Sequence, residues 1–334
     1  MTAPPSLLAA PDPAARAGLP RSTRIFVAGA GGMVGRAICD QLRREGFSDL
    51  LRPDSRQLDL RNRQAVFDWF CTHHPEAVIL TAARTGGIKA VTTRPLSLLS
   101  DNLRIQVNVL DAAAQSGVGR LLFLGSKCVY PQDAAQPIGE EALFTGALEP
   151  ADSANAVAKI AGIEHVLAVR RQLGLRWITA VPCNLYGPHD NFHPEQARVV
   201  PALMRRYHRA RLSGQQIVRN WGTGTPRREL LHVDDLARAC LLLLERYDDP
   251  SPINVGTGED VTIKELASMV AATVDYRGAV VWDADQPDGS PGGRLDVSRI
   301  TALGWKPQVS LGEGLARTYA WFSPGFAAGT VRGS

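Results

Sequence analysis

The sequence predicts an α/β fold, in which a doubly wound parallel sheet is followed by a smaller α/β domain. In the first half of the chain, short apolar runs that suit buried strands alternate with helical patterns. A glycine-rich turn joins the first of these runs to the first helical pattern. After about residue 184 the alternation breaks down, and single helical patterns stand among prolines and aromatic residues.

The expected strands are short runs dominated by Val, Ile, Leu and Ala. They cover residues 25–28, 50–51, 77–80, 121–124 and 177–181, and later 253–255. Helical patterns cover residues 64–71, 102–114 and 155–171, and later 200–210 and 261–274. This alternation predicts parallel strand pairing with helices on both faces, and the last strand is expected to return to the same sheet.

These patterns divide the chain into three parts. The first 22 residues are rich in Pro and Ala and lack the basic start and apolar core of a signal peptide, so we expect a disordered leader over 1–22. Residues 23–183 are expected to form the domain with the glycine turn, to which segments near 228–260 return. Residues 184–334 are expected to form mainly the second, substrate-binding domain.

The composition narrows the class of partner and the compartment. The formal net charge of +4 comes from scattered Lys and Arg residues, so we expect an anionic small molecule rather than a nucleic acid. The five cysteines are odd in number and form no CxxC pair, which argues against a disulfide framework or zinc site and favours the cytoplasm. No apolar stretch has the length of a membrane span, and no histidine pair has metal-binding spacing, so we expect neither a membrane nor a metal.

Three glycines give the first turn the pattern of a Rossmann-type dinucleotide site. Gly29 allows the tight turn, Gly32 allows backbone N–H groups to approach a pyrophosphate, and Gly35 allows the helix to pack closely on the strand. Met33 and Val34 lie between the last two glycines and are expected to contact the same ligand. Because a purely structural turn does not explain all three spacings, we expect a dinucleotide here.

Two arginines after the second expected strand bear on the choice of dinucleotide. An acidic residue at this place would hold the ribose diol of NAD(H), whereas an Arg accommodates the 2′-phosphate of NADP(H). Arg52 and Arg56 therefore favour NADP(H), while Asp54 between them keeps NAD(H) as an alternative. The other interpretation is that both arginines are solvated surface residues.

Six longer runs resemble the GDP-L-fucose synthase family of extended short-chain dehydrogenases. They read GGMVG at 31–35, AARTGGI at 82–88, LFLGSKCVYP at 122–131, NLYGPHDNF at 184–192, WGTGTPRRE at 221–229 and INVGTG at 253–258. Members of this family epimerise C3 and C5 of a GDP-4-keto-6-deoxymannose and then reduce C4 with NADPH. The resemblance therefore implies a nucleotide-sugar substrate and NADP(H), with Ala82 and Asp59 at the cofactor and Asp59 near the adenine.

The resemblance also implies a catalytic group of Ser, Tyr and Lys, in which one residue is replaced. Ser126 and Lys159 match the family serine and lysine, but the tyrosine position holds Asn155. Positions four apart share a helix face, where the Lys charge lowers the pKa of the phenol so that it can exchange a proton with a sugar carbonyl. Since an amide can only hydrogen-bond that oxygen, we expect the reductive step to be weakened or altered.

A second family pair, a Cys base and a His acid that epimerise the sugar, is also changed. Cys128 matches the cysteine, whereas Arg198 stands at the histidine position. Arginine stays protonated and cannot easily shuttle protons, but it can stabilise an enolate as a fixed cation. The alternative for Cys128 is an inert residue of the core.

The resemblance also assigns four residues of this chain to substrate binding. Arg206, Trp221 and Arg228 match family positions that hold the nucleotide diphosphate. Asn184 begins one of the matching runs and is counted with them. For Trp221, ordinary core packing is the alternative.

The replacements leave three interpretations open, and Gly292 and Gly293 add to them because the family has an Arg-Lys pair there. The first is an NADP(H)-dependent epimerase/reductase of a keto nucleotide sugar with altered reduction. The second is an epimerase, dehydratase or oxidase that acts on a different activated sugar in a secondary-metabolite pathway. The third is a catalytically dead subunit that binds cofactor.

The family further implies a homodimer formed through two long helices. The candidates are residues 102–114 and 155–171, and Ile105, Val109 and Ala113 lie on one face of the first. Core packing within one chain would explain this face equally well.

Overall fold

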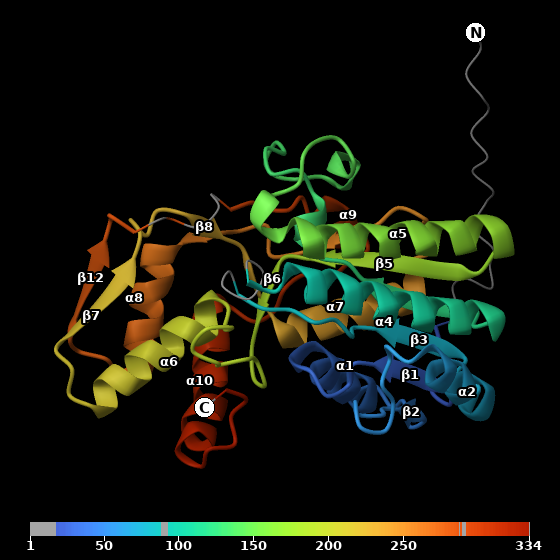
Figure 1. Ribbon diagram of the computed structural model, residues 1–334, viewed down its shortest axis with the longest axis horizontal. Helices are drawn as coiled ribbons and strands as arrows, with labels where there is room; N and C mark the ends of the chain where they lie inside the picture. The colour runs from blue at the N-terminus through green and yellow to red at the C-terminus, as the bar shows by residue number, and fades with distance from the viewer. Residues whose placement is uncertain (1–17, 88–92, 287, 289–291, 334) are drawn as a thin grey trace, which may run out of the picture.

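The computed structural model describes residues 18–87, 93–286, 288 and 292–333. These residues form two hydrophobic cores, one around a parallel sheet and one at the left of the view in Figure 1. Residues 1–17 of the expected leader, Ile88, and residues 287 and 289–291 lie outside the described residues.

The end of the expected leader belongs to the first core. Leu19 packs against this core, and Arg21 forms an ion pair with Glu245 and lies over the ring of Phe47. Leu19 and Arg21, which were expected to belong to the leader, therefore contact the first domain.

The predicted doubly wound parallel sheet is confirmed. Its strand order is β10-β5-β4-β3-β1-β2, and each neighbouring pair is parallel. The strands are β1 Ile25–Ala28, β2 Leu50–Leu51, β3 Ala77–Leu80, β4 Arg120–Leu124, β5 Arg176–Pro182 and β10 Ile253–Val255. Every residue of β1, β3 and β4 is buried, as expected for strands that carry helices on both faces.

Two groups of helices cover the sheet. They are α1 Met33–Arg44, α2 Arg63–His73, α4 Pro95–Gln115, α5 Ser153–Leu173 and α7 Val233–Arg246. Helix α4 packs against α2 and α5, whereas α1 packs against α7. Right-handed crossovers that run in opposite directions from β1 place these two groups on opposite faces of the sheet.

The second core gathers shorter elements (Figure 1). They are α6 Val199–Leu212, β7 Ile217–Trp221, α8 Ile263–Val274, β12 Ala279–Asp283 and α10 Leu311–Ala327. Two short ladders join it to the first core. They pair β6 Asn184–Tyr186 with β9 Leu230–His232, and β8 Arg227–Arg228 with β11 Val261–Thr262. One-turn helices η2 Lys127–Val129, η3 Glu140–Ala142 and η4 Pro150–Asp152, together with α9 Ser298–Ala302, complete the described chain.

The apolar face considered for a dimer is core. Ile105, Val109 and Ala113 are at most 8% exposed and belong to the first hydrophobic core. The large apolar side chains that α4 and α5 do expose are Leu96 and Val107 on α4 and Val157 and Leu173 on α5. No helix in the described part of the chain has both the length and the apolar character to cross a membrane.

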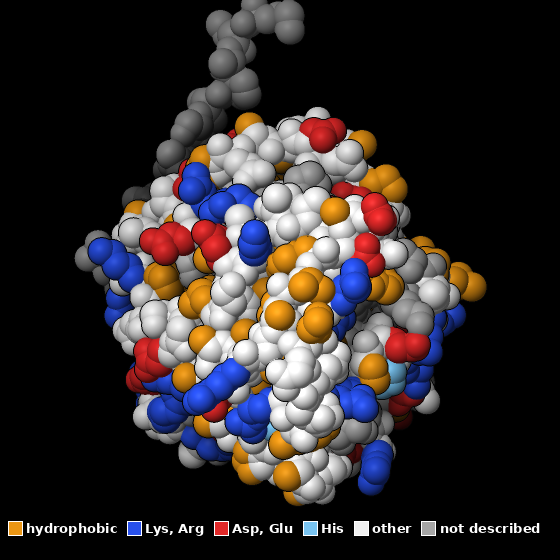
Figure 2. Space-filling model, turned by 90° about the vertical axis from the view of Figure 1, so that its left-hand side faces the viewer, with side chains coloured by type: hydrophobic (Ala, Val, Ile, Leu, Met, Phe, Trp, Pro, Cys, Tyr) orange, Lys and Arg blue, Asp and Glu red, His pale blue; other side chains and the backbone are white. Residues whose placement is uncertain are grey.

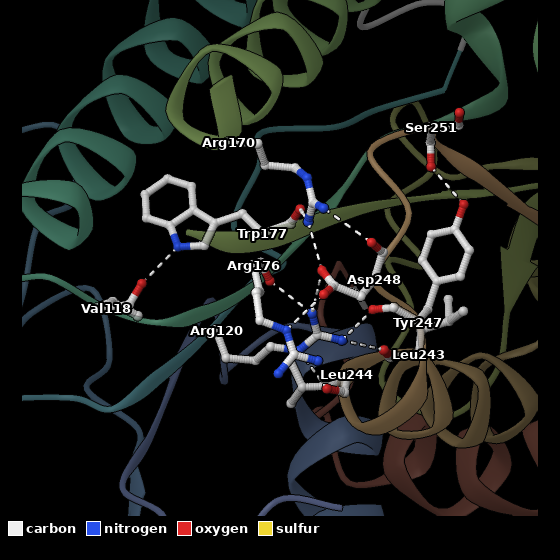
Figure 3. Close-up of polar contacts among 10 residues, drawn as sticks. All are labelled: Val118, Arg120, Arg170, Arg176, Trp177, Leu243, Leu244, Tyr247, Asp248 and Ser251. Atoms are coloured by element: carbon white, nitrogen blue, oxygen red, sulfur yellow. Dashed lines mark hydrogen bonds and ion pairs between the residues drawn. The ribbon is translucent and has the colours of Figure 1, made fainter. Parts of the chain in front are cut away.

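A polar network lies at the amino ends of β4 and β5 (Figure 3). The buried side chain of Arg120 donates hydrogen bonds to three backbone carbonyl groups at the end of α7. These belong to Leu243 (2.8 Å), Leu244 (2.6 Å) and Tyr247. Beside it, Asp248 pairs with Arg170 (2.9 Å) and Arg176 (2.8 Å). The last carbonyl groups of a helix are not all satisfied within the helix, and here the guanidinium of Arg120 donates hydrogen bonds to them.

Candidate active site

The main cleft lies at the opposite, carboxyl ends of the strands. Its volume is about 640 Å³, and its floor follows the ends of β1, β3, β4 and β5. From β1 the chain passes to β2 on one side, and it then crosses back to β3 on the other side of β1. The cleft therefore lies at the topological switch point, where open α/β sheets bind ligands. The opposite wall comes from residues 189–191, Arg198 and Arg332.

The glycine turn forms one end of this cleft. Gly29 has a φ of +94°, which strongly favours glycine. A Cβ on Gly35 would lie 2.2 Å from the carbonyl oxygen of Gly29, so only glycine allows the helix this close to the strand. Gly32 caps α1 without a side-chain hydrogen bond, which leaves the N–H groups of the first turn free for an anion. Met33 and Val34 line the cleft with them.

A second hollow of about 260 Å³ adjoins the turn. Arg52 lines it, as do Arg36 and Arg43, two residues of α1 that sequence reasoning missed. Arg36 donates from Nε to the carbonyl of Gly31 (3.0 Å). Arg56 lines neither hollow, so the structure brings only one of the two expected arginines to this place.

Two further residues that the resemblance assigns to the cofactor lie in the main cleft. Ala82 and Asp59 both line it. The carboxylate of Asp59 accepts two hydrogen bonds from Arg61 (2.9 and 2.8 Å), and these lower the pKa of Asp59 to about 2. Asp59 is therefore ionised and held in place by its neighbour.

Three of the expected catalytic side chains meet at the other end of the cleft. Ser126, Asn155 and Lys159 line it together. Lys159 is buried, donates from Nζ to the carbonyl of Leu124 (2.6 Å) and lies 4.9 Å from the ring centre of Phe123. Burial lowers the pKa of Lys159 to about 8, so the amine still carries most of its charge at neutral pH.

Cys128 lies behind Asn155. The amide Nδ2 of Asn155 donates to Sγ of Cys128 (3.4 Å), while its Oδ1 is buried without a partner among the described residues. Burial raises the pKa of the Cys128 thiol to about 11, and the charge of Asp152 adds to the rise. Cys128 is half-buried and does not line the main cleft as the structure stands.

Asp152 is a member of this group that sequence reasoning missed. It precedes Asn155 by three residues, and the side chains of both Asn155 and Cys128 contact its carboxyl group. Its Oδ1 is buried without a hydrogen-bond partner in the described part of the chain. Burial raises the pKa of Asp152, while these contacts and the charge of Arg198 act against the rise. An Asp before a helix reads as an N-cap in sequence, but this side chain makes no capping hydrogen bond.

Arg198 faces this group from the second core. It precedes the first residue of α6 and lines the cleft. Its charge acts on Cys128, Lys159 and Asp152. A second missed carboxyl, Asp190, lies in the same wall and is nine-tenths buried.

The expected substrate residues do not line the main cleft. Arg206 donates to Oδ1 of Asn220 (2.8 Å), and Asn184 donates to the carbonyl of Glu229 (3.0 Å). Arg228 donates to the carbonyl of Arg227 (2.7 Å). These three and Trp221 are not among the cleft-lining residues.

Trp221 is not a core residue. Its side chain is 69% exposed, so the alternative of ordinary core packing is wrong. It ends β7, at the end of the molecule that Figure 2 faces, where apolar side chains lie exposed among Lys and Arg side chains. At Gly293, one of the two glycines that replace the basic pair of the family, Lys127 donates from Nζ to the backbone carbonyl (2.9 Å).

Comparisons with known proteins agree with this geometry. The model of the NAD dependent epimerase/dehydratase family matches residues 25–256. GDP-L-fucose synthase 1 of Arabidopsis thaliana is 49% identical over 302 residues, which are 90% of this chain and 94% of that protein. The GDP-L-fucose synthase of Escherichia coli (strain K12) is 46% identical over 308 residues, which are 90% of this chain and 96% of that protein.

A solved structure extends the similarity to three dimensions. The GDP-mannoheptose C4 reductase MlghC from Campylobacter jejuni, with NADP bound, has a TM-score of 0.84 and 35% identity, and the match covers 92% of this chain and 100% of that one. The resemblance that the six sequence runs indicated is thereby confirmed. The chain belongs to the NAD dependent epimerase/dehydratase family and, within it, groups with the GDP-L-fucose synthases.

Proposed function

We propose that this protein is an NADP(H)-dependent enzyme that acts on a GDP-linked 4-keto sugar, with a weakened or altered reductive step. The observation that carries the proposal is one cleft with the glycine turn at one end and Ser126, Asn155 and Lys159 at the other. The relatives are named GDP-L-fucose synthases, and the reductase structure holds NADP, which supports the same substrate class and cofactor.

The residues present fit NADP(H). The uncapped start of α1 offers N–H groups to a pyrophosphate, and the second hollow with Arg36, Arg43 and Arg52 offers cations to a 2′-phosphate. When bound, the nicotinamide supplies a hydride to the carbonyl carbon of the sugar. Lys159 is placed to hold the nicotinamide ribose, and its charge declines as the pH rises through about 8.

The reductive step lacks an acid that could protonate the sugar oxygen. The Ser126 hydroxyl and the Asn155 amide can each donate a hydrogen bond to the carbonyl oxygen of the sugar. Neither is an acid near neutral pH, so the alkoxide that the hydride creates lacks a positioned proton donor. Loss of a general acid costs about 10²- to 10⁴-fold in rate.

Proton abstraction beside the ketone is also restrained. With a thiol pKa of about 11, Cys128 is a thiolate only rarely at neutral pH. Once an enolate forms, the fixed charges of Arg198 and Lys159 are placed to stabilise it.

A second candidate keeps the cofactor and changes the sugar. Gly292 and Gly293 replace a basic pair of the family, and Lys127 reaches the carbonyl of Gly293 instead. An epimerase, dehydratase or oxidase of another activated sugar fits this change. The third candidate, a cofactor-binding subunit without activity, is favoured by Asn155 and Arg198, since neither residue transfers protons readily.

The test is an assay of the purified protein with NADPH and GDP-4-keto-6-deoxymannose in deuterated water. NADPH oxidation is followed by absorbance, and deuterium in the sugar is followed by NMR. Slow oxidation that is lost in a Lys159→Met variant supports the proposal. Deuterium without oxidation favours an epimerase, and neither signal, with NADPH binding intact, favours another sugar or an inactive subunit. Failure to bind any nicotinamide dinucleotide would refute the proposal.

We also propose a homodimer formed through α4 and α5, and a cytoplasmic location. The exposed Val107 and Val157 on these helices support the first, and five unpaired cysteines fit a reducing compartment. Sedimentation of the parent and of a Val157→Asp variant tests the dimer, because a charge at the interface should shift the mass to that of a monomer.

A further inference from the structure

The segment after α10 folds back onto the wall of the main cleft. The backbone N–H of Phe192 donates to the carbonyl of Arg332 (3.0 Å), and Nη1 of Arg205 donates to the carbonyl of Gly333 (2.6 Å). Val331 is only 3% exposed and belongs to the second core. The segment is therefore held on both sides of Arg332.

Gly333 fixes where this segment lies. Its φ is +87°, and a Cβ there would lie 2.4 Å from the backbone N and Cα of His193. Any larger residue would push the segment away from the loop that forms the wall. Arg332 is thus presented by a built structure that accepts only glycine next to it.

Arg332 is an exposed residue and lines the cleft. Within the described ranges it has no hydrogen bond or ion pair, and the same holds for the side chain of Arg198. The charges of both arginines act on the carboxyl group of Asp190, which is nine-tenths buried. One carboxyl oxygen of Asp190 accepts from the N–H of Asn191 (2.7 Å), and the other lacks a partner among the described residues. Two cations and one anion leave this wall with an excess of positive charge.

The wall faces the start of α1. His189, the neighbour of Asp190, lines both the main cleft and the second hollow, where it lies with Ala30 and Gly31. The charges of Arg36 and Asp40 in α1 act on His189, which places this loop across from the helix start. The ring of His189 also packs at a tilt against Trp321 of α10, at 4.6 Å between ring centres, so α10 contacts this loop and leads into the segment that follows.

We propose that Arg332 binds a phosphate group of the nucleotide held in the main cleft, opposite the N–H groups at the start of α1. A guanidinium without a partner, an excess of positive charge and a helix N-terminus on the other side are what a diphosphate requires. The inference rests on the proposed function only in that the cleft holds a phosphate-bearing nucleotide. We expect the pyrophosphate of the dinucleotide to be the partner, and the diphosphate of the sugar nucleotide is the other source of the same chemistry.

Binding of NADPH, NADH and GDP to four variants separates these sources, with isothermal titration calorimetry as the measurement. Arg332→Ala should weaken NADPH and NADH equally, by about tenfold to a hundredfold, because a charge-assisted hydrogen bond to the shared pyrophosphate is lost. Arg52→Ala should weaken NADPH alone. Arg317→Ala, which removes an exposed Arg of α10 that pairs with Glu313, should change none of the three.

Gly333→Ala tests the position without removing the charge. It should weaken the same ligands as Arg332→Ala, because the added Cβ displaces the segment. The Arg332→Ala variant should have the same melting temperature as the parent protein, since the side chain of Arg332 makes no hydrogen bond in the described chain.

If Arg332→Ala weakens the binding of GDP alone, Arg332 still binds a phosphate group, but that group belongs to the sugar nucleotide. Unchanged affinity for all three ligands in Arg332→Ala would overturn the inference and leave the proposed function standing. A parent protein that binds none of the three would overturn both.

Discussion

The two ends of the central sheet treat their buried polar groups in opposite ways. At the amino ends of the strands, Arg120 gives hydrogen bonds to the last carbonyl groups of α7, and Asp248 is shared between two arginines (Figure 3). At the carboxyl ends, oxygen atoms of Asp152, Asn155 and Asp190 are buried without hydrogen-bond partners in the described residues.

This difference separates stability from function. A buried polar atom without a partner costs about 1–3 kcal/mol, so folding alone gives no reason to collect three of them around one cleft. A ligand, or a proton that moves during reaction, gives such atoms a partner. Substitutions at the carboxyl ends should therefore change activity or binding, and substitutions at the amino ends should change the free energy of unfolding.

The largest expected effect is a gain of activity in Asn155→Tyr. A phenol beside Lys159 restores a group that can protonate the sugar oxygen, so ketone reduction should rise by about 10²- to 10⁴-fold. Single-turnover oxidation of bound NADPH measures it. Asn155→Phe is the matched control, because it adds the ring without the hydroxyl. Equal rates in the two variants would mean that the pocket no longer places a carbonyl there.

The largest expected loss of stability is at the other end of the sheet. Arg120→Ala removes the hydrogen bonds that the guanidinium gives to three carbonyl groups at the end of α7, which should lower the free energy of unfolding by about 3–5 kcal/mol. Urea unfolding measures it. Arg171→Ala is the control, because the Arg171 side chain is 71% exposed and its loss should cost little. A loss below about 1 kcal/mol for Arg120→Ala would remove the contrast between the two ends.

The fold could be predicted because its signals are local. The strands at 25–28, 77–80 and 253–255 coincide with β1, β3 and β10, since each is a short apolar run that ends at polar or glycine residues. Helix ends were less certain. Helix α4 begins at Pro95, seven residues before the expected start at 102, because a proline in the first turn continues into a helix without a periodic apolar signal.

The site could be predicted only where a motif marks it. The glycine turn, Ser126, Asn155 and Lys159 lie together in the cleft, and each belongs to a family run or a fixed spacing. Arg332 comes from a segment far away in sequence that only the tertiary fold brings to the cleft. Asp190 lies inside a family run, but nothing in its sequence context says that its carboxyl is buried.

The buried carboxyl of Asp190, one oxygen of which has no hydrogen-bond partner among the described residues, should reduce stability at neutral pH. Burial raises its pKa to about 6 from an ordinary 3.8, so the folded protein holds the proton more tightly than the unfolded chain does. The stability this adds is present in full below pH 3.8 and is lost as the pH rises through about 6. Asp190→Asn should therefore stabilise the unliganded protein at pH 7.5 by about 1–3 kcal/mol, and by less at pH 5.

Urea unfolding at the two pH values tests this, with the exposed Asp133→Asn as the control. A gain that is the same at both pH values would show that titration of Asp190 is not its cause. The substitution should also strengthen the binding of an anionic ligand at this wall, because the one negative charge beside Arg198 and Arg332 is removed.

The smallest expected effect concerns the coupling of Asp152 to Cys128. The carboxylate charge raises the thiol pKa, so Asp152→Asn should lower it from about 11. At pH 8.5 the thiolate fraction, and with it the rate of alkylation by iodoacetamide, should rise severalfold, by about tenfold for each unit of pKa. Mass spectrometry follows the Cys128 peptide in a Cys71→Ser background, which removes an exposed thiol.

Glu149→Gln is the matched control for that experiment. Glu149 acts on Asp152, but Asp152 is the carboxylate that contributes to the raised pKa of Cys128, so this control should leave alkylation nearly unchanged. If Asp152→Asn also leaves the rate unchanged, the carboxyl and the thiol do not share an electrostatic environment. The unpartnered oxygen of Asp152 would then lower the stability of the fold without any effect on Cys128. At this residue the functional contrast with the paired network around Arg120 would not hold.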